Sequence, residues 1–396
     1  MSLLNEYIEK IKEGWTNIEF ESELLKLISE YNKLRNTYLL VYGAAIGKPI
    51  PEVSLVHADF YTIRDLLASK KGLHKKVDMY IETPGGSGET AEEIARFLHN
   101  NFDTVSFVVS GEAKSAGTII VLSGDEILMT ETGSLGPIDA QVRIGRSSVS
   151  AYDYIEWVEE KRKEAEERGR LNPFDATMVA QITPGELRSV YHTLKFAEDL
   201  VIEWLTKYKF KEWTVTETQK LPVTEEMKMK RAKEIANELI NHSKWRSHGR
   251  SIKIDDLERI GLKITRVDED PKLADIVYRI QTVCRMIFDN STCFKIFATQ
   301  DYKIFRQAVS IKAPIMVPAK QTIEAVDFGL HCPKCGKGYR LYAKFNSNPN
   351  IDADLKNKGL IPFPKDNILK CECGFEIDLL GIRDQIEREA RKKIVF

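Results

Sequence analysis

Two short glycine-containing segments carry the residue types that acyl-transfer chemistry requires. Thr83–Gly86 ends in a glycine pair after an expected strand, and Gly111–Gly117 lies between an expected strand and an expected helix. A glycine pair lets backbone N–H groups approach a bound carbonyl oxygen closely. Ser115, at the strand-to-helix turn of the second segment, would project its hydroxyl beside a helix N-terminus, where negative charge is favoured. Together the two segments could supply a nucleophile and an oxyanion hole.

In this interpretation Ser115 is the nucleophile and the N–H of Ala116 is one oxyanion donor. The second donor would be the N–H of Gly86 or that of Gly85. Taken singly, each segment has a simpler structural explanation, because a serine often caps a helix and a glycine pair often forms a tight turn. The order of the two segments and their strand-to-helix context favour the catalytic interpretation.

The elements that must position these residues alternate along the chain. Alternating apolar residues at Val77–Ile81 and an apolar run at Val105–Val109 predict two strands, and Ala91–Leu98 between them has helical spacing. A third strand is expected at Ile127–Met129, followed by a turn-rich edge at Gly133–Asp139. Repeated units of this length indicate a layered α/β fold.

The regions on either side of these units have other patterns. Residues 1 to about 70 have helical spacing, and we interpret 1–50 as an N-terminal helical arm used for packing or oligomerisation. The composition changes after Pro318, where cysteine pairs and further prolines and asparagines appear. We therefore expect a main domain at 51–315 and a small separate C-terminal module at 325–396.

On these motifs the sequence resembles the Clp protease/crotonase superfamily, and within it the serine dehydrogenase proteinase family, which is related to signal peptide peptidase A. The resemblance covers about residues 50 to 265 and rests on Thr83–Gly86, Lys114–Thr118 and Gly133–Asp139. It implies a ClpP/crotonase-like spiral of ββα units and a homo-oligomer. It also implies a serine peptidase that hydrolyses peptide bonds in peptides or unfolded proteins, with Ser115 as the nucleophile.

The resemblance also bears on the proton acceptor that a serine hydroxyl needs. In Clp-type proteases a histidine follows the serine, and here the corresponding position is Asp139, which argues against a Ser-His-Asp triad. Asp139 is then either a polar residue of the site or a residue that holds a turn. The signal peptide peptidase branch uses a Ser–Lys dyad instead. His248, within Ser247–Arg250, remains an alternative base.

Several lysines compete for the role of base. Lys195 lies in an apolar part of the helix predicted from Pro184 to Lys209, and burial is what lowers a lysine pKa toward neutrality, so we favour Lys195. This part of the sequence also resembles the helix that carries the catalytic lysine in archaeal relatives of signal peptide peptidase A. Lys161 and Lys163 lie in a charged run that is typical of a solvated helix face. Lys114 adjoins the serine, and neighbours in sequence rarely face each other.

Four of the six cysteines form two close pairs, Cys332 with Cys335 and Cys371 with Cys373, and a glycine follows each pair. Four thiolates at such spacing favour a closed, tetrahedral zinc site with a structural role. The second pair has one intervening residue rather than two, which departs from the usual pattern. We predict a zinc-ribbon-like module that folds around the metal. Docking of a protein is an alternative role, and binding of nucleic acid is a weaker one.

Composition excludes other classes of protein. The 396 residues include 58 Lys and Arg against 59 Asp and Glu, so the net charge of −1 gives no global argument for binding nucleic acid or a membrane surface. No apolar run is long enough to span a membrane, and Met1–Gly14 lacks the apolar region of a secretory signal. We expect a cytoplasmic protein. No phosphate-binding loop is present, so any energy-driven unfolding would come from another protein.

Two other functions stay open at this point. Crotonase relatives use paired N–H groups to stabilise thioester enolates, although no coenzyme A signature is evident here and a serine at a helix start suits that chemistry poorly. An inactive scaffold that presents its cysteine module to a partner is the second. The sequence gives neither the physiological substrate nor the cleavage preference nor the number of subunits.

Overall fold

The structure, a computed structural model, describes residues 2–70, 72–138, 141–144, 147–216, 220–245, 247, 249–308, 324–390 and 392–396. The chain divides into two compact units between residues 309 and 310. No helix in these described ranges is long and apolar enough to cross a membrane.

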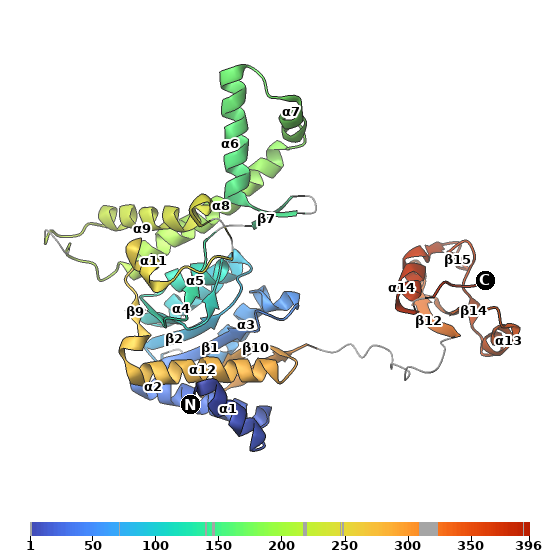
Figure 1. The fold of residues 1–396 in the computed structure, drawn as a ribbon, viewed down its shortest axis with the longest axis horizontal. Helices are drawn as coiled ribbons and strands as arrows, with labels where there is room; N and C mark the ends of the chain where they lie inside the picture. The colour runs from blue at the N-terminus through green and yellow to red at the C-terminus, as the bar shows by residue number, and fades with distance from the viewer. Residues whose placement is uncertain are drawn as a thin grey trace. The chain divides into compact units, whose positions relative to one another are not determined.

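A seven-stranded mixed sheet forms the centre of the first unit, in the order β11-β10-β1-β2-β3-β5-β9 (Figure 1). The strands β1, β2, β3, β5 and β9 run parallel, β10 pairs with β1 in an antiparallel arrangement, and β11 pairs with β10 in the same way. The bounds are β1 Tyr38–Ala44, β2 Lys76–Glu82, β3 Thr104–Val109, β5 Glu126–Met129, β9 Thr265–Arg266, β10 Cys293–Ala298 and β11 Lys303–Gln307. The predicted α/β class is confirmed, as are the strands expected at 77–81, 105–109 and 127–129.

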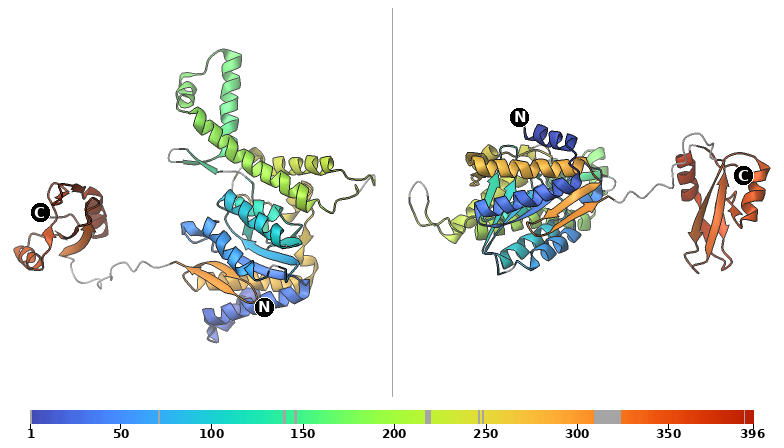
Figure 2. Two further views of the ribbon diagram at one scale, coloured as in Figure 1. Left: turned by 180° about the vertical axis from the view of Figure 1, so that it is seen from behind. Right: turned by 90° about the horizontal axis from the view of Figure 1, so that it is seen from below.

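Helices cover both faces of this sheet (Figure 2). Side chains alternate across β1, so Leu40 and Tyr42 enter one core cluster while Leu39 and Val41 enter the other. The first cluster includes helices α3 His57–Ala68, α4 Gly88–Asn101 and α5 Ala116–Leu122. The second includes α1 Leu3–Lys12, α2 Asn17–Arg35 and α12 Pro271–Asp289.

The prediction of helix throughout residues 1 to about 70 is wrong at 38–44. This stretch is β1, and all of its residues are buried. A strand that is covered on both faces consists of consecutive apolar residues without alternation. Sequence periodicity alone cannot distinguish such a strand from a segment of a buried helix. The expected arm at 1–50 is also not separate from the domain, because Tyr7 and Leu24 share a core cluster with Val277 of α12.

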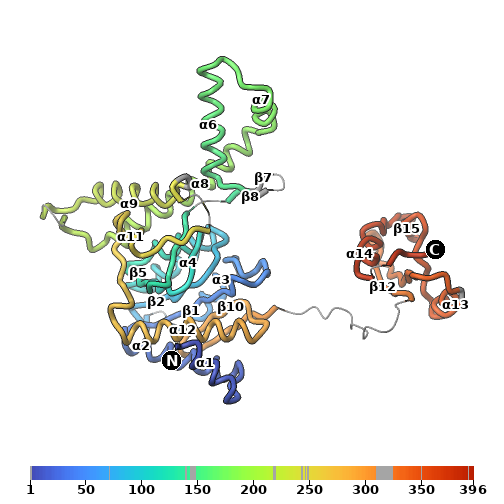
Figure 3. The backbone as a smooth tube through the Cα atoms, in the orientation of Figure 1, coloured from blue at the N-terminus to red at the C-terminus, as the bar shows by residue number. Residues whose placement is uncertain are grey.

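A helical extension lies beyond the sheet (Figure 3). Its elements are α6 Ala151–Arg168, α7 Pro173–Val179, α8 Pro184–Trp204, the π-helical turn Leu205–Lys209, α9 Glu225–Ile240, α10 His242–Trp245 and α11 Ile254–Arg259. The helix α8 packs against α5, α6 and α9, and it joins this extension to the layer that carries Ser115. The helix predicted from Pro184 to Lys209 is confirmed, with its last turn π-helical.

Short ladders at the carboxyl ends of the parallel strands build a second, smaller layer. Strand β4, Glu112–Ala113, pairs in parallel with β6, Ser134–Leu135. Thr83 forms a bridge with Ala113, and Leu55 forms a bridge with Gly86. The residues 51–53 are a single 3-10 turn, and β7 Gln141–Ile144 pairs with β8 Ser147–Ser150. This layer holds both glycine-containing segments.

The second unit has its own small core, which includes Leu341, Ala343 and Leu379. Its elements are β12 Ala325–His331, β13 Gly338–Lys344, α13 Pro349–Asn357, β14 Ile361–Pro362, β15 Ile368–Lys370, β16 Glu376–Asp378 and α14 Leu380–Ala390. They form a three-stranded sheet, β12-β13-β14, and a separate hairpin of β15 and β16.

A chain shortened to residues 1–308 should keep the fold of the first unit. Its last strand, β11, ends at Gln307 and completes the edge of the seven-stranded sheet, so the truncation removes no strand of that sheet. We expect one cooperative thermal transition within about 3 °C of the corresponding transition in the full chain. Circular dichroism and calorimetry measure it, and a non-cooperative transition in the shortened chain would contradict the two-unit division.

Candidate active site

Ser115 occupies the turn between β4 and α5 in an uncommon backbone conformation. Its φ is 49° and its ψ is −116°. This conformation is unfavourable for any residue other than glycine, and it persists only where the surrounding structure imposes it. The residue is partly exposed, and its hydroxyl makes no capping hydrogen bond with α5. The simpler explanation of Ser115 as a helix cap therefore does not hold.

Lys114 fixes the segment that holds Ser115. Its backbone N–H donates to the carbonyl of Thr83 over 3.0 Å, and its carbonyl accepts from the N–H of Gly117 over 2.8 Å. Its buried ammonium donates to four oxygens, which are Ser134 Oγ, Leu135 O, Arg250 O and Ser251 Oγ, at 2.9–3.3 Å. Burial lowers the pKa of Lys114, yet with all its protons engaged this group acts as a donor that binds segments together.

The glycine pair fits closely between Ser115 and a neighbouring backbone. A Cβ added at Gly85 would lie 2.7 Å from the Cβ of Ser115, and one added at Gly86 would lie 2.4 Å from the carbonyl oxygen of Leu55. Both glycines have a positive φ, 103° at Gly85 and 147° at Gly86, which other residues adopt at a cost. Only glycine fits at both positions, and the pair places its backbone directly against the serine.

The hydrogen bonds distinguish between the two glycines as oxyanion donors. The N–H of Gly85 donates to Thr83 Oγ1 over 3.2 Å, so it is already engaged. The N–H groups of Gly86 and Ala116 have no acceptor in the described part of the chain. Of the two alternatives that the sequence left open, the Gly86 N–H is the one available to bind a carbonyl oxygen, together with that of Ala116.

The surroundings of Lys195 differ from the expected apolar ones. Its ammonium lies 3.0 Å from the carboxylate of Glu198 and 3.1 Å from that of Asp199, and hydrogen bonds to these groups raise its pKa. Glu198 and Asp199 follow Lys195 by three and four residues, a spacing that puts all three side chains on one helix face and is the sequence signal for these contacts. The expectation of a lowered pKa is thus wrong for this arrangement. The helix borders the site nonetheless, since the Phe196 ring lies 3.3 Å from a Cβ built at Gly88.

The other candidate bases lie elsewhere or outside the described residues. Lys161, on α6, pairs with Asp175 over 2.8 Å, and hydrogen bonding to that carboxylate raises the Lys161 pKa. Lys163, on the same helix, is exposed, as expected of a solvated face. Asp139 and His248 both lie outside the residues that the structure describes.

Three residues near the site were not identified from the sequence. Leu55 pairs with the glycine segment through its backbone alone, so its side chain carries no signal of this role. Asp59 and Lys295 form a fully buried ion pair between segments far apart in the chain. The one local signal is the position of Asp59 in the first turn of α3, where an acidic residue is common.

In the second unit the four predicted cysteines come together. The Cys332 and Cys373 sulfurs are 3.7 Å apart, the Cys335 and Cys371 sulfurs are 3.5 Å apart, and all four lie within 4.8 Å of one another. A tetrahedron with metal–sulfur bonds of about 2.3 Å has edges of about 3.8 Å. The hydroxyl of Tyr339 donates to Cys371 Sγ and lowers the pKa of that thiol to about 6. The cluster is therefore compatible with a bound metal ion.

Comparison with known proteins supports the resemblance found in the sequence. Residues 64–172 match the ClpP-like SDH-type serine proteinase family. Two uncharacterized proteins of Methanocaldococcus jannaschii are 30% identical over 124 residues and 35% identical over 66 residues. These matches cover 30% and 17% of this chain and 43% and 23% of the relatives, so the chain spans less than half the length of either.

Two solved structures also align with the chain. A mutant of the 1510-N membrane-bound stomatin-specific protease is 13% identical, with a TM-score of 0.33, over 56% of this chain and 79% of that one. A mutant of ClpP1 from Listeria monocytogenes is 11% identical, with a TM-score of 0.32, over 61% of this chain and 98% of that one.

Replacing Gly86 by alanine should disable the site while Gly47→Ala does not. The new Cβ at 86 would meet three backbone atoms of Leu55 within 2.9 Å at a φ of 147°, whereas Gly47 has nothing within 4 Å of its Cβ position. We expect Gly86→Ala to lose about 1–3 kcal/mol of unfolding free energy. We also expect at least about a 100-fold lower rate of labelling by a fluorophosphonate probe, because the Gly86 N–H would change direction and could no longer bind an oxygen beside Ser115. Equal labelling of the two variants would contradict this geometry.

Proposed function

We propose that the protein is a serine peptidase, with Ser115 as the nucleophile and the N–H groups of Gly86 and Ala116 as the oxyanion hole. The observation that carries the proposal is the contact between the non-capping serine, at positive φ, and the glycine pair. The match of residues 64–172 to a serine proteinase family supports hydrolysis over enolate chemistry.

The chemistry follows from this arrangement. The Ser115 hydroxyl oxygen attacks the scissile carbonyl carbon as its proton passes to a general base. The carbonyl oxygen becomes an oxyanion held by the two N–H groups, and loss of one such donor typically costs about 100- to 1,000-fold in rate. The tetrahedral intermediate then expels the amine, which takes the proton back from the base, and water hydrolyses the acyl-enzyme in a second round of the same steps.

For the base we propose Lys195, which would make a Ser–Lys dyad. The packing of α8 against α5 and the contact of Phe196 with the start of α4 support it, because they bring this helix beside the site. A lysine accepts a proton only when it is neutral, so Lys195 has to leave Glu198 and Asp199 and enter a less polar environment. Binding of substrate or of a second copy of the chain would supply that change.

The wider proposal is a homo-oligomeric, cytoplasmic peptidase that acts on peptides or unfolded proteins, built on a ClpP/crotonase-like spiral of ββα units. The short β4–β6 ladder beside the main sheet supports the spiral. Exposed apolar side chains on the helical extension support assembly: Phe174, Met178 and Tyr191 are 72%, 46% and 49% exposed. Burying these apolar side chains between subunits would remove them from water, which contributes favourably to association.

Ser115→Ala should abolish both covalent labelling by a fluorophosphonate probe and hydrolysis of a fluorogenic peptide. The matched control is Ser69→Ala, an exposed serine that ends α3 and should change neither. Mass spectrometry of the labelled peptide identifies the modified residue. Hydrolysis by a folded Ser115→Ala protein would disprove the nucleophile, and the absence of labelling in the wild-type oligomer would favour an inactive scaffold.

The dyad predicts a shift in the pH dependence of the rate. Glu198 and Asp199 raise the Lys195 pKa, so Glu198→Gln/Asp199→Asn should lower it. A lower pKa leaves more neutral lysine at a given pH, so the ascending, low-pH limb of kcat/KM against pH should move to lower pH. Lys195→Ala should lower the rate of hydrolysis at least about 100-fold. If Lys195→Ala has full activity, His248→Ala and Asp139→Asn identify the alternative base.

We also propose that the four cysteines hold one structural zinc ion. The sulfur separations of 3.5 and 3.7 Å are close to those of a tetrahedral thiolate site, and the second unit's own core is small. Zinc ligation would stabilise this unit by closing it around the metal.

Elemental analysis should therefore find about one zinc ion per chain, as expected of a four-thiolate site. Cys332→Ser should lose the metal and the cooperative unfolding of the second unit, while labelling of Ser115 is retained. Cys284→Ala, which removes a buried cysteine of the first unit, is the control and should keep the metal. A metal-free wild-type protein with a folded second unit would contradict the site.

A further inference from the structure

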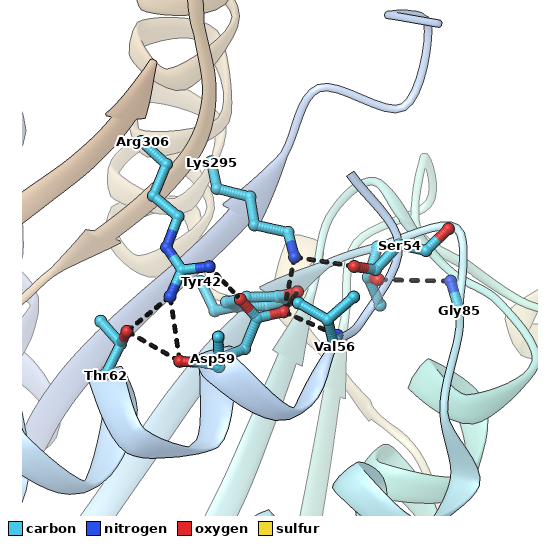
Figure 4. A network of polar contacts seen from close by, with 10 residues as sticks. Tyr42, Ser54, Val56, Asp59, Thr62, Gly85, Lys295 and Arg306 are labelled. Atoms are coloured by element: carbon cyan, nitrogen blue, oxygen red, sulfur yellow. Dashed lines mark hydrogen bonds and ion pairs between the residues drawn. The ribbon is translucent and has the colours of Figure 1, made fainter. Parts of the chain in front are cut away.

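A fully buried ion pair lies beside the glycine segment (Figure 4). Lys295 comes from β10 and Asp59 from α3, they are 236 positions apart, and both side chains are 0% exposed. Neither is among the residues assigned to the site so far. Taking two charges out of water carries a free-energy cost that their attraction offsets only with good geometry, so a buried pair is weak evidence for a purely stabilising role.

Lys295 and Asp59 form hydrogen bonds with the backbone on both sides of Leu55. The Lys295 ammonium donates to the carbonyl oxygen of Ser54 over 2.7 Å, and Asp59 Oδ2 accepts from the backbone N–H of Val56 over 3.0 Å. One charged partner thus holds the residue before Leu55 and the other holds the residue after it. The peptide groups that flank Leu55 are fixed in direction by these two charge-assisted bonds.

Leu55 in turn holds the glycine segment. Its N–H donates to the carbonyl of Gly85 over 2.7 Å, and its carbonyl accepts from the N–H of Ser87 over 3.0 Å. Gly86 lies between these two bonds, with no room for a Cβ against the Leu55 backbone. The direction of the Gly86 N–H is therefore set by Leu55.

A second route joins the same pair to the same segment. The Tyr42 hydroxyl donates to Asp59 Oδ2 over 3.1 Å and also contacts the Thr83 side chain. Thr83 Oγ1 accepts the N–H of Gly85 over 3.2 Å. Through Tyr42 and Thr83, the buried carboxylate is also connected to Gly85.

A second cation, Arg306, also lies beside the Asp59 carboxylate. The Nη1 atom of Arg306 lies 3.2 Å from Asp59 Oδ1, an ion pair without hydrogen-bond geometry. Its Nη2 atom donates to the carbonyl of Ala58 and to the hydroxyl of Thr62 over 2.9 and 2.8 Å. Arg306 is partly exposed, so it does not share the full desolvation of Lys295.

We propose that Lys295 and Asp59 are positioning residues that aim the Gly86 N–H at the oxyanion, acting through Leu55 and through Tyr42 and Thr83. The inference rests on the proposed function, in which Gly86 is an oxyanion donor. Within the described part of the chain, neither side chain forms a hydrogen bond or an ion pair with Ser115. An oxyanion exists only during the reaction, so a misdirected donor lowers kcat and leaves KM nearly unchanged.

The test compares two charge-neutralising double variants of the full chain. Asp59→Asn/Lys295→Met removes both charges together, because either single change leaves an unpaired buried charge and can prevent folding. The control is Arg35→Met/Glu126→Gln, which removes the 2.6 Å ion pair of these residues and the 3.5 Å ion pair of Arg35 with Asp78, at the amino-terminal ends of the strands and away from the glycine segment. Urea unfolding of both variants measures their free energies of unfolding, so that their activities are compared at known stability.

Two readouts separate positioning from general stabilisation. The first is kcat and KM for the fluorogenic peptide. The second is amide hydrogen exchange in the peptide that covers Thr83–Ser87, whose Ser87 N–H is protected by the Leu55 carbonyl. For Asp59→Asn/Lys295→Met we expect kcat about 10- to 100-fold lower, KM within about threefold, and exchange at least about tenfold faster. The control should change neither.

The other outcomes would contradict either the positioning role or the proposed function. Normal exchange in Asp59→Asn/Lys295→Met, or equal changes in both double variants, would overturn the positioning role. Faster exchange with an unchanged kcat would also overturn it, because the segment would be held by the pair without any effect on the oxyanion. If the wild-type activity does not depend on Ser115, the proposed function itself fails, and the exchange experiment still decides whether the pair holds the segment.

Discussion

At Gly86 the backbone of Leu55 approaches so closely that a Cβ would lie 2.4 Å from its carbonyl oxygen and 2.6 Å from its nitrogen. This contact is the constraint on which the rest of the site depends. On its other side, the same glycine segment leaves no room between Gly85 and the Cβ of Ser115. The segment is thus held between Leu55 and Ser115, and glycine is the residue that allows both approaches at positive φ.

The topology explains why these segments meet. Both glycine-containing segments follow neighbouring parallel strands, β2 and β3, and the carboxyl ends of parallel strands share one edge of the sheet. The hydrogen bond from the Lys114 N–H to the Thr83 carbonyl joins the two segments directly. The unusual backbone of Ser115 is then imposed from both sides, because the Lys114 ammonium is tied to four oxygens of two further segments.

The sequence predicts the local parts of this site well and its long-range parts poorly. The strands at 77–81 and 105–109 are recognisable because their patterns depend on nearby residues. The four cysteines are recognisable because their side-chain chemistry and spacing are local as well. Leu55 could not be found in this way, since its role is carried by backbone atoms that any residue has. The partners Asp59 and Lys295 are joined only by the fold, which places β10 beside β1.

The lysines show why burial alone does not predict a base. Lys114 is buried among uncharged oxygens, and its pKa is lowered, but every proton of the ammonium has an acceptor. Lys195 and Lys161 face carboxylates, and their pKa values are raised. A general base must be neutral and must also have a free lone pair, so none of these three meets both conditions in this arrangement. In the proposed peptidase, deprotonation of Ser115 would therefore require either a rearrangement that separates Lys195 from its two acidic partners or a base from another part of the chain.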